Sequence, residues 1–301
     1  MLKSTLSAIS NASRVFIVRA VVVFVVGWAV LGLAYGYLVA RTVIIETTTS
    51  TFRIALKEDL DPLSLGPFTL CRERAVPDPR ESGLAQFGCA PSLYEISEYS
   101  EPSLFFPQGS QLEFRVIGDR FEVEAIALPE GWDAAKRGFG QGAIFSVPVD
   151  RLRELGQLAA TGTISIGTKG TAAKGALHAG RYEIYGKSLT GLIPRSRSVL
   201  LNEAPIPAGA FVTLTRALSG KDATAHIQLT AMAEDGARAL SLLAISETAP
   251  VDLKLELFQT DPILLRPSFA DAFQNDPLLI VLITLLGALA TAIELSKKRE
   301  D

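Results

Sequence analysis

An uncharged apolar stretch near the amino terminus constrains this chain more than any other feature. Ala20–Ala40 contains 21 residues without a charged side chain. A helix of that length, rising about 1.5 Å per residue, covers the hydrocarbon core of a bilayer, which is about 30 Å thick. A second apolar stretch, Pro277–Ile293, lies near the other end of the chain. We therefore expect two transmembrane helices, over residues 15–40 and 277–295.

Apart from Arg41, basic residues flank the two apolar stretches on one side only. Lys3, Arg14 and Arg19 precede the first stretch, and Lys297–Arg299 follow the second. Positive flanks stay on the cytoplasmic side of a membrane. The sequence thus predicts a bacterial inner-membrane protein whose two short ends, 1–14 and 296–301, are cytoplasmic. A cleaved signal peptide is the rival interpretation of the first stretch, but its apolar core is too long for one.

The middle region, residues 41–276, is expected to form an extracytoplasmic β-rich domain. Short segments of alternating polarity lie between turn residues, which is typical of an antiparallel sandwich or barrel. Pro129–Gly142 is rich in glycine and polar residues, so it is a candidate sub-domain boundary. The predicted fold class is therefore a mainly β extracytoplasmic domain, sandwich- or barrel-like and antiparallel, flanked by two transmembrane α-helices.

Gln111–Leu128 carries the clearest local pattern. Apolar and polar residues alternate on both sides of Gly118-Asp119, a dipeptide suited to a two-residue hairpin turn. The turn sets the cross-strand pairs: Phe114 with Val123, Val116 with Phe121, and Arg115 with Glu122.

A short helix and a glycine-rich loop are expected further along. Asp150 is placed to cap a helix running through Ala159 and ending near Gly162. Gly162–Gly175 resembles a phosphate-binding loop at first glance. Lys169 comes two residues after Gly167 instead of one, and no helix-forming run follows. We therefore interpret this segment as a hairpin tip.

The two cysteines, Cys71 and Cys89, both lie in the middle region. In an oxidising compartment they would form a disulfide, closing a loop of about 19 residues and contributing roughly 3 kcal/mol. Two free buried thiols are the alternative. Two cysteines and two distant histidines lack the spacing of metal ligands, so we expect no metal and no cofactor.

Small residues recur at four-residue spacing in both apolar stretches. Gly32, Gly36 and Ala40 form such a stripe in the first, and Gly287 and Thr291 in the second. Small residues on one face allow helices to approach closely in a membrane. The stripes therefore predict either packing of the two spans or contact with a partner, although such spacing also arises by chance.

No constellation of residues predicts catalysis. His178 and His226 are the only histidines, and neither has an orienting motif beside it. We therefore expect a non-enzymatic two-pass protein whose periplasmic domain is a scaffold or accessory subunit of an envelope complex. Its expected partners are the lipid bilayer, other membrane or periplasmic proteins, and a second copy of itself. An acidic excess in the middle region argues against nucleic acid.

Two other functions remain open. The first is a membrane-anchored extracytoplasmic hydrolase or carbohydrate-binding module, in which Trp132, Phe139 and the acidic segment Glu95–Glu101 would line a cleft. The second is a signalling component that couples ligand binding to rearrangement of the spans. The signalling hypothesis is weakened because the sequence shows no cytoplasmic output domain.

Overall fold

The computed structural model describes residues 26–27, 30, 38–63, 66–77, 89–99, 104–134, 138–168, 177–187, 198–234, 237–257, 261–275, 281 and 284. The chain divides into two compact units. The larger unit comprises Ala40–Tyr185 and Asn202–Leu265, and the smaller comprises Met1–Val39, Gly186–Leu201 and Arg266–Asp301.

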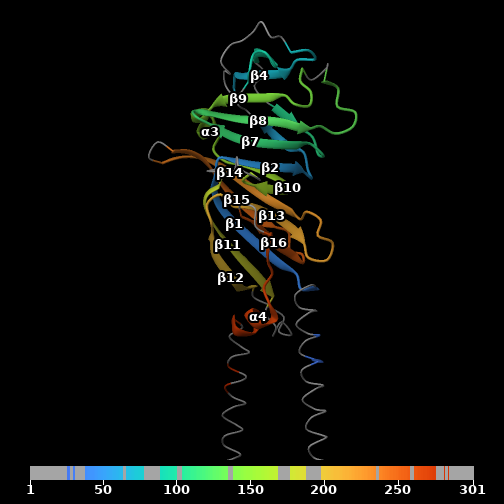
Figure 1. Cartoon of the computed structure of the whole chain (residues 1–301), viewed down its shortest axis with the longest axis vertical. Coiled ribbons are helices and arrows are strands. Elements are labelled where there is room, and N and C mark those ends of the chain that lie inside the picture. Colours follow the sequence, from blue (N-terminus) through green and yellow to red (C-terminus); the bar gives the residue numbers. More distant parts are fainter. Residues whose placement is uncertain are drawn as a thin grey trace, which may run out of the picture. The chain divides into compact units, whose positions relative to one another are not determined.

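Strands dominate the described residues (Figure 1). The two helices with assigned bounds are short: α3 (Val149–Leu155) and α4 (Phe269–Asn275). The strands are β1 (Arg41–Thr49), β2 (Thr51–Leu56), β3 (Leu60–Leu63), β4 (Phe68–Glu73), β5 (Tyr94–Tyr99), β6 (Leu104–Phe106), β7 (Gln111–Ile117), β8 (Arg120–Ala127), β9 (Ile144–Pro148), β10 (Leu158–Ile166), β11 (Leu177–Lys187), β12 (Ser198–Ile206), β13 (Phe211–Arg216), β14 (Thr224–Glu234), β15 (Ala237–Ser246), β16 (Val251–Glu256) and β17 (Ile263–Leu265).

One large sheet contains 15 of these strands, in the order β12-β11-β1-β15-β14-β10-β2-β7-β8-β9-β4-β5 with a side branch. Figure 1 shows β2, β7, β8, β9 and β4 following one another in this order. Strands β3 and β6 form a separate pair. The pairs whose register the described residues define are antiparallel. The antiparallel β part of the predicted fold class is therefore confirmed.

The side branch starts at β10. Gly162 and Thr163 pair with both β2 and β14, so these two strands lie on opposite sides of β10. Ser165 and Ile166 pair with β2 and with β13, so β13 follows β14 along the same side. Strands β16 and β17 then extend from β13. Strand β16 also contacts β1, and both strands contribute to one hydrophobic core. The sheet therefore divides at β10. The branch that contains β13 and β16 packs against the part of the sheet that contains β1.

The predicted hairpin is confirmed in register. Strands β7 and β8 pair Phe114 with Val123, Arg115 with Glu122, and Val116 with Phe121. Gly118 in the turn has φ +61°, a conformation that suits glycine because it lacks a Cβ. Local alternation and turn chemistry were sufficient to specify this element.

Aromatic side chains fill the core under this hairpin. Phe52 stacks on Phe114 with ring centroids 4.7 Å apart, and Phe114 lies 5.9 Å from Phe121. All three rings are at most 2% exposed. Burying each such side chain stabilises the fold by roughly 1.5–3 kcal/mol relative to exposing it. The inner face of the sheet therefore supplies much of the driving force for folding.

The predicted helix after Asp150 is shorter than expected. It ends at Leu155, and strand β10 already begins at Leu158. Gly156 between them has φ +76°, a left-handed conformation that commonly ends a helix. Leu158 and Ala159, which we expected within this helix, pair with β14 instead.

The smaller unit contains a capped helix. At the start of α4, Ser268 N donates to Asp271 Oδ2 at 2.6 Å and Asp271 N donates to Ser268 Oγ at 3.2 Å. This reciprocal pair satisfies two backbone donors that a helix start leaves free. At the other end Asn275 Nδ2 donates to Leu201 O at 3.2 Å. Ala272 packs with Leu201 and Val39 in a small apolar cluster.

The prediction of two transmembrane helices flanking the β domain is wrong. Among the described residues, no helix combines the length and the apolar composition needed to cross a bilayer. Helices α3 and α4 have seven residues each, or about 10 Å, against a hydrocarbon core of about 30 Å. The predicted placement in a bacterial inner membrane, with cytoplasmic termini and a periplasmic domain, depended on those spans and is withdrawn with them.

Most of the residues behind that prediction lie outside the described part of the chain. Of residues 20–40 the structure describes 26, 27, 30 and 38–40, and of 277–293 only 281 and 284. Gly32, Gly36, Gly287 and Thr291 are outside it, so the predicted helix packing concerns residues that the structure does not describe. Ala40 is described and lies directly before β1, without helical assignment.

Gly162, predicted to begin a hairpin tip, lies within β10 instead and is required by close strand packing. A Cβ at this position would collide with Ala55 O and lie 2.7 Å from Ile54 Cγ1. We therefore expect Gly162→Ala to lower the free energy of unfolding by about 1–3 kcal/mol, as overpacking does. Urea denaturation measures this loss. Gly118→Ala is the control, because an added Cβ there would meet no atom within 4 Å and would cause backbone strain only. An equal loss of stability in both variants would contradict the steric explanation.

Candidate functional site

Charged side chains lie on the face of β2, β7 and β8 that is opposite the aromatic core. Because side chains alternate along a strand, residues directly opposite one another on neighbouring strands share a face. One row runs from Arg115 through Glu122 and Ser146 to Thr69. A second row pairs Arg53 with Glu113 and Glu113 with Glu124.

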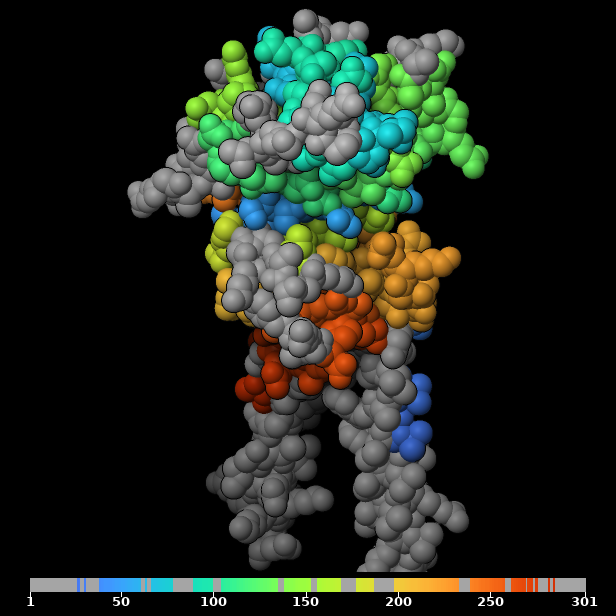
Figure 2. All heavy atoms as spheres, turned by 45° about the horizontal axis from the view of Figure 1, so that its top comes forward, coloured from blue at the N-terminus to red at the C-terminus, as the bar shows by residue number. Residues whose placement is uncertain are grey.

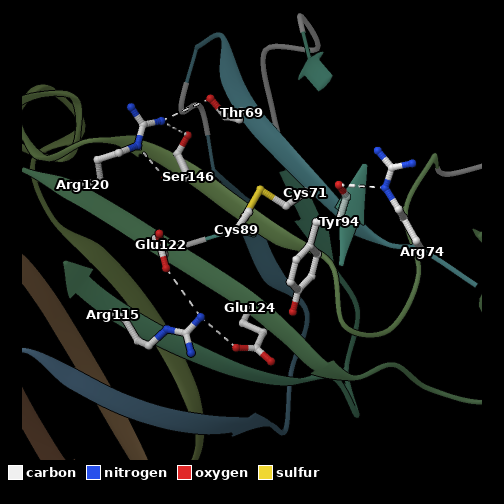
Figure 3. The surroundings of a disulfide bond; sticks show 10 residues. All are labelled: Thr69, Cys71, Arg74, Cys89, Tyr94, Arg115, Arg120, Glu122, Glu124 and Ser146. Carbon is white, nitrogen blue, oxygen red and sulfur yellow. Dashed lines mark hydrogen bonds and ion pairs between the residues drawn. A yellow bond between two sulfur atoms is a disulfide. The ribbon is translucent and has the colours of Figure 1, made fainter. Parts of the chain in front are cut away.

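Arg115 is the centre of this charged face (Figure 3). Its Nη2 lies 2.9 Å from Glu124 Oε2 and 3.5 Å from Glu122 Oε2, and its Nη1 lies 3.9 Å from Glu113 Oε1. Arg53 Nε donates to Glu113 Oε2 at 2.6 Å. Two arginines therefore pair with three carboxylates in a network that crosses β2, β7 and β8.

Glu122 is the most deeply buried member of the network. It is 1% exposed, and its carboxylate makes no hydrogen bond shorter than the 3.5 Å ion pair with Arg115. Burial raises the pKa of Glu122, while the nearby charges of Arg115 and Arg120 oppose that rise. A buried acid with a raised pKa is a feature of general acids. However, Glu122 lines neither of two cavities in the described chain, one beside Phe139 and one beside Arg53, so these cavities give a substrate no access to it.

We expect Glu122→Gln to raise the free energy of unfolding by about 1 kcal/mol near pH 8. The raised pKa means that the folded state binds this proton more tightly than the unfolded state, so stability falls as pH rises through the raised pKa. Glutamine imitates the protonated form, and Arg115 keeps Glu124 as a partner. The gain should disappear near pH 3, where the carboxyl is largely protonated in both states.

Urea denaturation at the two pH values measures this effect. Glu124→Gln is the matched control, because its side chain is 26% exposed and makes the shortest contact with Arg115. We expect no gain from it. A loss of stability near pH 8 in Glu122→Gln would show that the ionised carboxylate stabilises the fold.

A disulfide bond lies beside the charged face, where it joins Cys71 on β4 to Cys89. Cys71 and Cys89, the two cysteines that the sequence predicts to pair, are joined and fully buried. They form a small apolar cluster with Ile144, against which Tyr94 and Ile96 pack. Figure 3 shows Tyr94 directed toward Glu124. Burial, Glu124 and Glu73 raise the pKa of Tyr94, so its phenol stays neutral at physiological pH.

The other predicted site residues are spread over the sheet. His226 on β14 is exposed, with Nδ1 3.1 Å from Thr161 Oγ1, and His178 on β11 is exposed as well. Neither lines a described cavity. Within the described ranges no three His, Cys, Asp or Glu residues are grouped to hold a metal ion.

The predicted aromatic cleft is present in part. Phe139 lines a cavity of about 400 Å³, and Trp132 Nε1 donates to Phe139 O at 3.0 Å. Glu95 and Glu98 are exposed on β5 and are not in the cavity lining. Glu101 lies outside the described residues. Arg72, which no sequence pattern singled out, lines this cavity from β4.

The sheet has three terminal strands, and they differ in how they are protected. Exposed charged residues and proline discourage pairing with other chains. Strand β5 carries exposed Glu95 and Glu98, and β12 carries exposed Glu203 and Pro205. Strand β17 carries neither kind within its three residues, although Asp261 and Pro262 directly precede it and Arg266 and Pro267 directly follow it.

Strand β17 presents apolar side chains instead. Ile263 is 46% and Leu264 is 54% exposed. In the described chain β17 pairs with β16 only, so its second edge has no strand partner there. The red-orange segment that contains β17 reaches the surface in Figure 2. A short apolar edge without a strand partner in the described chain is able to accept another extended strand.

The chain was compared with known proteins. No family model matches it, and no curated protein or solved structure is similar to it. The functional assignment therefore depends on the geometry described above.

Proposed function

We propose that this protein is a non-catalytic binding module that takes up an extended segment of another polypeptide at the free edge of β17. The observation that carries the proposal is the exposure of Ile263 and Leu264 on a terminal strand without charged or proline residues. Backbone groups of such an edge provide affinity, and side chains provide selectivity.

The register of β17 indicates what the partner must supply. Leu264 lies opposite Lys254, and Ile263 lies opposite Leu255. Ile263 and Leu264 project from opposite faces because side chains alternate. A complementary strand therefore carries apolar residues on both faces. Since β17 has only three residues, much of the binding free energy must come from side-chain contacts.

Selection of binding peptides tests this proposal. A random peptide library is selected on the wild-type protein after depletion on a Leu264→Gln variant. Glutamine is chosen because a lysine would repel Lys254 across the strand pair. We expect apolar, strand-forming peptides whose binding weakens about tenfold or more in Leu264→Gln, as for loss of an anchor side chain.

Leu218→Gln is the matched control, because Leu218 is also an exposed leucine, at 67%, and lies in the turn after β13. It should leave peptide binding unchanged. Peptides that bind both variants and the wild type equally would contradict the proposed site. Dimerisation of the wild type that Leu264→Gln abolishes would identify a second copy as the partner instead.

A further inference from the structure

A second cavity, of about 190 Å³, lies on the charged face of the sheet, where β7, β2 and β10 run side by side. Ala55 on β2 pairs with Gln111 on β7 and with Thr163 on β10, so these three side chains share one face. Arg53 and Ser165 pair in the next row of that face. All five residues line the cavity. Because Ala55 carries only a methyl group, it leaves space between the longer side chains of its neighbours.

An irregularity in the pairing of β7 with β8 gives this cavity an apolar wall. Gln111 pairs with Ala127 and Leu112 pairs with Ala125, so Ile126 is an extra residue without a partner on β7. A bulge of this kind redirects the side chain of the extra residue, and bulges are over-represented beside active sites. Ile126 is half-buried and lines the cavity. The bulge therefore places an apolar side chain among polar ones.

Asp222 borders the cavity from the turn that joins β13 to β14. Hydrogen bonds on both sides of Asp222 hold its backbone in place. Arg216 N donates to Lys221 O at 2.7 Å, and Ala223 N donates to Leu214 O at 2.8 Å. The Asp222 side chain is exposed, so its carboxylate is accessible to a ligand. The cavity thus has a fixed acceptor on the side away from β7.

The polar side chains of the lining offer both kinds of hydrogen-bonding group. Arg53 and Gln111 carry N–H donors, and Asp222 carries a carboxylate acceptor. The hydroxyl groups of Thr163 and Ser165 are able to donate or accept. This mixture suits a ligand whose own groups both donate and accept, as the hydroxyl groups of a sugar do. The C–H groups of a sugar ring would contact Ile126.

We propose that this cavity binds a single uncharged sugar ring. The lining contains one arginine and one aspartate, and Arg53 is already paired with Glu113 at 2.6 Å, so an ionic ligand gains little from it. The volume is smaller than that of sites for drug-sized molecules, which limits the ligand to one ring. The site is separate from β17, so it stands or falls independently of the proposed function.

Methyl NMR of the full chain, labelled at the δ-methyl groups of isoleucine, tests this site. The probes are the methyl α-pyranosides of glucose, galactose and mannose, and the Ile126 resonance is assigned by its loss in Ile126→Val. We expect at least one glycoside to shift this resonance in a saturable manner. Free alanine, a zwitterion, and acetate, an anion, should leave it unchanged.

Two variants connect the shift to the cavity. Ala55→Leu should fill the cavity and abolish the shift. Asp222→Ala changes an exposed turn residue, so it remains informative if Ala55→Leu does not fold. It should raise the dissociation constant of the glycoside about tenfold, through loss of a charged acceptor.

Lys221→Ala is the control, because Lys221 is an exposed residue of the same turn and does not line the cavity. It should change the dissociation constant less than about twofold. The proposal would be overturned by the absence of a saturable shift with all the glycosides, by an equal shift with alanine or acetate, or by unchanged binding in Asp222→Ala.

Discussion

Replacing Phe145 by alanine is expected to lower the free energy of unfolding by about 4 kcal/mol. Phe145 on β9 is 1% exposed and lies at the centre of an aromatic group. Its ring centroid is 5.6 Å from Phe68, 5.7 Å from Phe106 and 4.8 Å from Phe139, in edge-to-face arrangements. The substitution removes buried apolar area and leaves a cavity between strands that cannot collapse independently.

Urea denaturation followed by far-UV circular dichroism measures this loss. Ile117→Ala is the control, because Ile117 ends β7 with 48% of its surface exposed. We expect it to change stability by less than about 0.5 kcal/mol. A loss below about 1 kcal/mol in Phe145→Ala would mean that the aromatic group is not packed as described.

Removing Asp252 is expected to destabilise the protein by about 3–5 kcal/mol. Asp252 Oδ1 lies 3.7 Å from Arg41 Nη1, and both side chains are 2% exposed. Arg41 is also anchored by its backbone, since its N–H donates to Ala249 O at 2.9 Å. In Asp252→Ala the guanidinium cannot leave the interior easily, so a buried positive charge loses its neighbouring carboxylate.

A double variant distinguishes this charge penalty from general damage. Replacing both residues, Arg41→Met with Asp252→Leu, removes the two charges and keeps apolar volume. We expect it to recover most of the stability lost in Asp252→Ala, because paired buried charges contribute little net stability. Urea denaturation of the single and double variants completes the comparison. Additive losses would show that the two side chains do not interact energetically.

The hairpin of β7 and β8 could be predicted because the required information is local. Alternating polarity decides which side chains share a face, and Gly118-Asp119 sets the register. The Cys71–Cys89 pairing could also be predicted, because two cysteines allow a single intramolecular pair.

Long-range pairing could not be predicted in the same way. The division of the sheet at β10 depends on residues such as Ser165 and Thr213, which are far apart in the chain. No local pattern indicates that β10 has three neighbouring strands. Likewise, Arg72 and Phe139 line one cavity only because β4 and the loop after β8 meet in the folded protein.

The membrane prediction shows a different limitation. Hydropathy measures how strongly a segment avoids water, and the length criterion assumes that the whole apolar stretch is one helix. The helices with assigned bounds in the described chain are far shorter than that criterion requires. The expectation of a scaffold protein depended on those spans, so the binding proposed at β17 is argued instead from the exposed side chains of that strand.

Photo-crosslinking in the cells that express the protein tests the central proposal most directly. A benzophenone amino acid is placed at position 264 of β17 or, as the control, at position 218, and adducts are mapped by mass spectrometry. Our account predicts a dominant adduct from position 264, with one contiguous segment of a partner polypeptide, that Ile263→Gln abolishes. Similar adducts from both positions, or none from position 264, would contradict it.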